Sequence, residues 1–269
     1  MTSPTRLLAF VALLAAVFAL AGVAGNAADL GKTEPAAEAG HGGSEPMADP
    51  VRGLGVSADG MTLDLARTTA APGRRFELRF AIRDRQGRVV RDFDVEHTKR
   101  MHVIVARRDL TGFQHLHPTQ RPDGTWAVPV RLADPGAYRV FADFSRDDMP
   151  RTLGGDLAVD GPVDSRRLPA AGRIAQTDGF DVALKPGPGK LDFEVTRAGE
   201  RVDVEPYLGA RGHLVALREG DLAYLHVHPD ADRLRFEVEF PTAARYRLFL
   251  QFKVAGRVHT AAFTREVGR

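Results

Sequence analysis

From residue 54 onward, apolar and polar positions alternate in short runs that are separated by turn-forming residues. In the run 234–240, charged residues separate the apolar positions Leu234, Phe236, Val238 and Phe240. Alternate residues of a strand share one face, so this run predicts a half-buried strand. No run after the N-terminal segment has a helical period. The predicted strands are 61–67, 76–84, 101–107, 112–116, 125–130, 138–144 and 155–159, followed by 180–184, 191–197, 213–218, 223–227, 233–240, 246–252 and 259–264.

The two halves of this pattern correspond to each other. Residues 138–141 read Tyr-Arg-Val-Phe, and residues 246–249 read Tyr-Arg-Leu-Phe. Such a correspondence indicates an internal duplication. Seven short strands in each half are typical of an antiparallel sandwich. The sequence therefore predicts an all-β fold with two tandem immunoglobulin-like (cupredoxin-like) β-sandwiches, at residues 53–163 and 170–269.

The N-terminus predicts a targeting segment, because residues 7–25 form an uninterrupted apolar run after Arg6. Its length approaches the span of a bilayer, which favours a membrane anchor, and Gly25-Asn26-Ala27 would also suit signal cleavage. We predict a signal or anchor helix over residues 1–26 and a flexible Ala-, Gly- and Pro-rich linker over 27–52. Either outcome places the sandwiches outside the cytoplasm, on the cell membrane or secreted.

Composition narrows the possible chemistry. The formal net charge of +2 does not indicate a nucleic-acid surface. The chain has no cysteine, which excludes disulfides, thiolate metal sites and the cysteine ligand of blue-copper proteins. There is no GxSxG motif, P-loop or dinucleotide-binding glycine pattern, and Glu96, six residues before His102, is the single suggestive general base. We therefore predict a protein that is not an enzyme.

Six of the nine histidines lie in two equivalent windows, 102–118 and 213–229. Each window begins with a histidine, and thirteen residues later two more follow, one residue apart and then a proline. The windows share one other identity, an arginine at position 107 or 218. The six histidines are His102, His115 and His117 in the first copy, and His213, His226 and His228 in the second.

This spacing is that of a β-hairpin with its histidines on one face. A hairpin that turns about Asp109 and Leu110 places residue 102 opposite residue 117, and one that turns a residue earlier places it opposite 115. Both registers put all three histidines of the window on the same face. Neighbouring positions on such a face are about 4.5–7 Å apart, so the imidazoles could reach one ion at about 2 Å.

Imidazole ligands suit Cu(II), Zn and Ni, so each triad predicts a metal site, for copper or zinc. Residues near each triad could supply further ligands. Alternatively, the histidines pack with apolar neighbours inside each sandwich and stabilise the hairpin, as part of a structural or protein-interaction module without metal. The further ligand candidates are His97, Met101, Asp143 and Asp148 for the first site, and His259 for the second.

The segments 101–105, 113–118 and 136–144 resemble the YtkA-like exported bacterial β-sandwich proteins. The resemblance covers residues 75–159 well and 191–267 more loosely, and it departs at Gln251, which stands where the first copy has Asp143. It implies a membrane-associated protein that handles copper or another heavy metal, with a metal-export system or other extracytoplasmic protein as partner. It does not imply a reaction.

Overall fold

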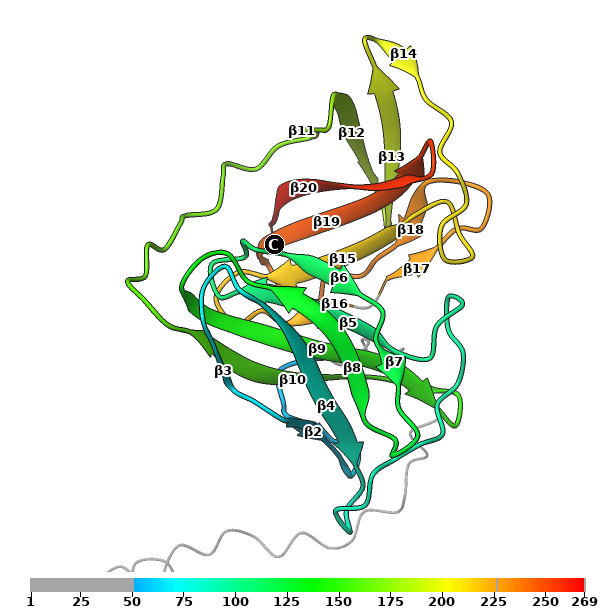
Figure 1. Ribbon diagram of the computed structural model, residues 1–269. Coiled ribbons are helices and arrows are strands. Elements are labelled where there is room, and N and C mark those ends of the chain that lie inside the picture. The colour runs from blue at the N-terminus through cyan, green and yellow to red at the C-terminus, as the bar shows by residue number, and fades with distance from the viewer. Residues whose placement is uncertain (1–50, 226, 269) are drawn as a thin grey trace, which may run out of the picture. The chain divides into compact units, whose positions relative to one another are not determined.

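The computed structural model describes residues 51–225 and 227–268 (Figure 1). The predicted N-terminal helix, nearly all of the predicted linker, and His226 lie outside the described residues. Within them, the chain forms strands and no helix, so none of this part contains a helix that could cross a membrane. The described residues belong to one compact unit.

The first repeat is a sandwich of two five-stranded sheets. All pairings in it are antiparallel except that of β3 with β10. In spatial order, one sheet consists of β1 (Ser57–Ala58), β2 (Met61–Leu65), β4 (Arg75–Arg83), β8 (Trp126–Arg131) and β7 (Thr119–Gln120), and the other of β3 (Thr69–Ala70), β10 (Met149–Val159), β9 (Gly136–Arg146), β5 (His102–Arg107) and β6 (Gln114–Leu116).

The second repeat has the same two-sheet plan, which confirms the predicted all-β duplication. In spatial order, one sheet consists of β11 (Ile174–Thr177), β12 (Phe180–Gly187), β13 (Lys190–Arg197), β18 (Arg235–Glu237) and β17 (His228–Pro229), with β14 (Glu200–Arg201) paired to β13, and the other of β16 (Tyr224–Leu225), β15 (His213–Arg218), β19 (Ala244–Val254) and β20 (Arg257–Val267).

Each repeat also has a tyrosine typical of immunoglobulin-like sandwiches. Tyr138 Oη donates to the carbonyl oxygen of Asp134 at 2.8 Å, and Tyr246 Oη donates to that of Thr242 at 2.9 Å. A buried tyrosine that bonds to the backbone a few residues upstream holds the corner before a central strand. The tyrosine that the two matching segments share therefore has the same structural role in both repeats.

The strand β5 is buried on both faces, because its alternate residues belong to two different cores. Val103 and Val105 lie in the core between the two sheets of the first sandwich. Ile104 and Ala106 point to the opposite face and pack in a separate cluster with Val215, Leu217, Tyr224 and Phe249 of the second repeat. The outer faces of the two repeats thus cover each other. Each large apolar side chain that is fully buried there stabilises the folded state by about 1.5–3 kcal/mol relative to an exposed one.

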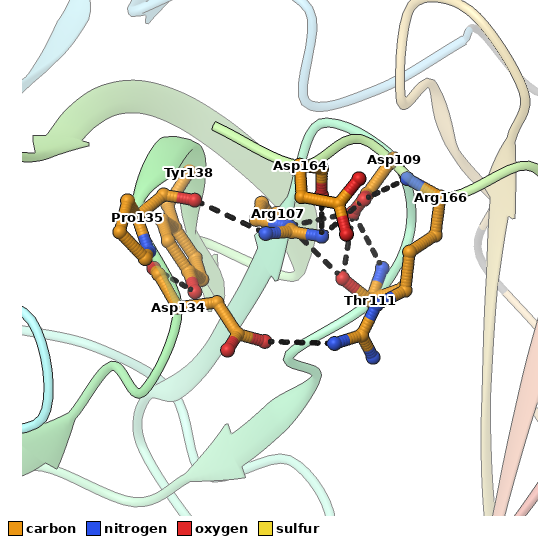
Figure 2. A network of polar contacts seen from close by, with 8 residues as sticks. All are labelled: Arg107, Asp109, Thr111, Asp134, Pro135, Tyr138, Asp164 and Arg166. Carbon is orange, nitrogen blue, oxygen red and sulfur yellow. Dashed lines mark hydrogen bonds and ion pairs between the residues drawn. The ribbon is translucent and has the colours of Figure 1, made fainter. Parts of the chain in front are cut away.

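The turn after β5 is held by the arginine that both histidine windows share. Arg107 forms a two-point ion pair with Asp109, at 2.9 Å and 2.5 Å, and its remaining N–H groups donate to the carbonyl oxygens of Pro135 and Asp164 (Figure 2). Asp109 also accepts from the backbone N–H of Arg166. Arg107 is therefore structural: it joins the hairpin turn to the loop before β9 and to the segment between the repeats.

Candidate metal centre

The predicted hairpin is present in the first repeat as β5 and β6. Val103 lies opposite Leu116 and Ile104 lies opposite His115, which is the register that turns about Asp109 and Leu110. His102, Ile104 and His115 therefore share one face. That face is not the interior of the sandwich, where the packing alternative placed it, but the outer face that the second repeat covers.

The three histidine rings of the first window gather at the open end of this hairpin. The ring centroids lie 5.2 Å apart for His102 and His115, 5.0 Å for His102 and His117, and 4.9 Å for His115 and His117. One ring nitrogen from each residue lies within 4.8 Å of the others. Two nitrogens that bind one ion at about 2.0–2.1 Å are at most about 4.2 Å apart. In a tetrahedral site the same bond lengths put two nitrogens about 3.4 Å apart, so the residues fit a metal ion once side-chain shifts bring the farthest pair closer by up to about 1.4 Å.

Two of these rings turn their outer nitrogens toward carbonyl oxygens. His102 Nε2 lies 3.3 Å from the backbone oxygen of Glu96, and His115 Nδ1 lies 2.7 Å from Oε1 of Gln251. The inner nitrogens, His102 Nδ1 and His115 Nε2, are 3.0 Å apart. If both outer nitrogens donate to the oxygens, both inner nitrogens of the neutral rings carry lone pairs that face each other. Metal-bound histidines usually donate their other ring N–H group to a carbonyl or carboxylate oxygen in this way.

The surroundings of these histidines favour the neutral imidazole, because burial lowers the pKa of each. Burial is the main cause that lowers the pKa of His102, and burial together with the neighbouring imidazoles lowers that of His115 to about 3 and that of His117 to about 4. In addition, Nε2 of His117 is buried without a hydrogen-bond partner among the described residues. A neutral imidazole with an unused nitrogen is the form that binds a metal ion.

His213 belongs to the same cluster, although it comes from the second repeat. Its ring centroid lies 5.6 Å from that of His102, 5.5 Å from His115 and 4.9 Å from His97. Burial and the other histidines lower its pKa to about 2. A cavity of about 30 Å³ is lined by His97, His102, His115 and His213 together with Asp143. Its volume holds about one water molecule or one ion.

The ring of His97 is held there by a strained turn. His97 and Thr98 both have positive φ angles, 47° and 67°, between the paired residues Glu96 and Lys99. A positive φ is unfavourable for most residues and most of all for a β-branched one. At the equivalent turn of the second repeat, Leu208 precedes Gly209. Strain of this kind gathers at functional sites.

The other proposed ligands lie differently. Met101 points to the face opposite His102 and is buried in the core of the first sandwich, so this candidate does not lie among the histidines. Asp148 is exposed beyond β9. Asp143 lies opposite His102 and lines the cavity, where it accepts from Thr152 and Tyr224. His259 pairs with Asp178 at 2.7 Å and packs on Phe180 and Phe252.

The triad of the second repeat is described only in part. β16 ends at Leu225, and the chain then crosses to the other sheet, where His228 pairs with Glu237. His226 and the side chain of His228 lie outside the described residues. The predicted second site at His213, His226 and His228 therefore stays a prediction, whereas the ring of His213 lies among the histidines of the first repeat.

Comparison with known proteins gives a family and distant structural likenesses. No curated protein matches the chain. Similar solved structures include Escherichia coli alpha-2-macroglobulin activated by porcine elastase, with 14% identity over 77% of this chain and 20% of the other and a TM-score of 0.29. The Escherichia coli adhesin FdeC has 13% identity over 82% of this chain and 66% of the adhesin chain, with a TM-score of 0.29. A two-domain fibronectin type III segment of chicken tenascin has 10% identity over 76% of this chain and 97% of the tenascin segment, with a TM-score of 0.23.

The chain thus spans about a fifth of the macroglobulin chain and about two thirds of the adhesin chain. These TM-scores carry no argument about function. A family model matches in two segments, residues 56–161 and 175–269, which cover one sandwich each. The chain belongs to the family described as "Domain of unknown function (DUF8832)", present here as two consecutive copies.

Proposed function

We propose that this protein binds copper or a similar ion, such as zinc, through His102, His115 and His117, and that it sequesters or delivers the ion outside the cytoplasm without catalysing a reaction. The apolar run at residues 7–25 would attach it to the membrane or direct its export. The resemblance to YtkA-like proteins favours copper among the metals that imidazole suits, and a metal-export protein as partner.

One observation carries the proposal: the inner nitrogens of His102 and His115 face each other at 3.0 Å while both outer nitrogens lie against oxygen atoms. When both outer nitrogens carry the protons, the lone pairs of the inner nitrogens repel each other. A cation bound to both would remove this repulsion and would also use the unpartnered Nε2 of His117. A site of three neutral imidazoles, partly buried and backed by carbonyl oxygens, agrees with copper or zinc and disfavours Mg²⁺ or Ca²⁺, which prefer oxygen ligands.

The competing proposal is a structural module with a metal-free histidine cluster. If the Gln251 amide turned its nitrogen toward His115, a chain of donors would run from Gln251 through His115 and His102 to the Glu96 carbonyl. This arrangement satisfies His102 and His115 without an ion. It leaves the buried Nε2 of His117 without a partner among the described residues, which favours the metal site.

The first test is metal binding by the purified protein. Titration with Cu(II) and with Zn(II) is expected to show a site that the double variant His115→Ala/His117→Ala weakens by more than about 100-fold. Even the loss of a hydrogen-bond partner of a metal-bound histidine costs about 10–100-fold in affinity. His259→Ala is the matched control, because this histidine contacts Asp178 and not the cluster. The proposal fails if the wild type binds neither metal more tightly than the double variant.

A second prediction tests whether the Gln251 side chain accepts a hydrogen bond from His115 or donates one to it. If its oxygen accepts from His115, Gln251→Glu supplies a stronger acceptor and should bind Zn(II) at least as tightly as the wild type. Gln251→Leu removes the acceptor and should bind about 10–100-fold more weakly. Isothermal titration at pH 7 measures both. Tighter binding by the Leu variant than by the Glu variant would contradict the assigned hydrogen bond.

A further inference from the structure

We propose that the metal site is shared between the repeats, with His213 of the second repeat as its fourth imidazole ligand. This inference rests on the proposed function. It differs from the sequence prediction, in which His213 belongs to a separate site of its own repeat.

The position of His213 follows from its strand. β15 repeats the pattern of β5, so Leu214 and Ala216 lie in the core of the second sandwich, while Val215 and Leu217 lie in the cluster between the repeats. His213 shares its face with Val215 and Leu217. Because the outer faces of the two repeats cover each other, the strand carries this imidazole to the histidines of the first repeat.

The Nε2 atom of His213 is buried and available to bind an ion. The residue is only 8% exposed, it lines the cavity, and its Nε2 has no hydrogen-bond partner among the described residues. Leaving a buried polar group unpaired costs about 1–3 kcal/mol. A metal ion bound to the lone pair of this nitrogen would remove this cost.

Four imidazoles complete the tetrahedral coordination that structural zinc sites have, whereas three leave an open position. His213 lies outside the group of nitrogens that are within 4.8 Å of one another, so it must move toward the ion on binding. Binding would therefore pull the two repeats together through β5 and β15. The same ion would then contact both copies of the duplicated unit.

The second repeat also supplies a positioning residue. Gln251, which lies opposite His213 on β19, contacts His115 through its Oε1 and Thr260 through its Nε2. One strand pair of the second repeat thus presents a ligand and the hydrogen-bond partner of another ligand. The second repeat would therefore both bind the ion through His213 and orient His115 through Gln251, which agrees with a site shared between the repeats.

X-ray absorption spectroscopy of the zinc-loaded full-length protein tests the inference, because it counts imidazole ligands. The wild type is expected to show four, and His213→Leu three, with affinity lowered at least about tenfold. His213→Gln, which keeps a polar group of similar reach, should behave like the Leu variant and guards against a folding defect. His259→Ala should leave both the count and the affinity unchanged.

The outcomes separate the two proposals. If the wild type binds no metal, the proposed function fails and the shared site with it. If the wild type binds zinc with three imidazoles, and both His213 variants bind with unchanged affinity and spectrum, the site belongs to the first repeat alone and only this inference is overturned.

Discussion

Acidification from pH 7 to pH 5 is expected to lower the free energy of unfolding of the metal-free protein by about 6 kcal/mol. In the unfolded chain a histidine has a pKa near 6.5. In the fold, burial and mutual repulsion lower the pKa to about 3 for His115, about 4 for His117 and about 2 for His213. Below pH 6.5 the unfolded state therefore binds more protons, and stability falls as the pH falls. Each of the three histidines contributes roughly 2 kcal/mol over this interval.

Glu96 works in the opposite direction, since burial raises its pKa, but it is one carboxyl group against three imidazoles. The loss is a large share of the ~5–15 kcal/mol by which domains are usually stable. Urea denaturation at the two pH values, with a chelator present, measures it. His213→Leu removes one of the three groups and should reduce the loss by about 2 kcal/mol. Equal stability at pH 5 and pH 7 would show that the histidines are not buried as neutral rings.

Replacement of Arg107 by Met is expected to destabilise the protein by about 3–5 kcal/mol, because it leaves the partner charge buried and unpaired. The side chain of Asp109 is 9% exposed. Burial alone would raise the pKa of Asp109, but hydrogen bonds from Arg107, Arg166 and Thr111 hold it far below its usual range. Without Arg107, the carbonyl oxygens of Pro135 and Asp164 lose a donor as well.

Arg218→Met is the matched control in the second repeat. Arg218 pairs with Asp221 in the same two-point manner, but Asp221 is 41% exposed, so water can replace the lost partner. Its loss should cost about 1 kcal/mol. Urea denaturation of the two variants compares them. The double variant Arg107→Met/Asp109→Asn should regain part of the stability, and equal effects of the two arginine variants would refute the argument from burial.

The sequence predicted the sandwich strands well because their alternation is local. The hairpin register also followed from local arithmetic, since the side-chain period of two leaves few choices. Six short strands of two to four residues were not predicted, because such runs carry too few positions for a period to show. The predicted strand at 223–227 ends early, at Leu225, where the chain crosses to the other sheet.

What the sequence could not give is which face the histidines occupy. The residues of β5 are all buried, so its apolar run has no polar side to mark the outside, and Ile104 looks like Val103 in a sequence. The contacts of His115 with Gln251, and of His213 with the first triad, join residues far apart in the chain and depend on how the repeats pack. A signal was present nonetheless: a strand that is apolar on both faces must be covered twice.

The covering of one repeat by the other has a consequence for how such a protein can evolve. Ile104 and Val215, Ala106 and Leu217, and Phe141 and Phe249 are equivalent positions that meet in one cluster, as the surfaces of a twofold-symmetric dimer do. In a dimer of identical subunits every substitution appears on both sides. Fusion into one chain removes that constraint and keeps the partner at high effective concentration. Asp143 against Gln251, and His97 against Leu208, are differences that two identical subunits could not have.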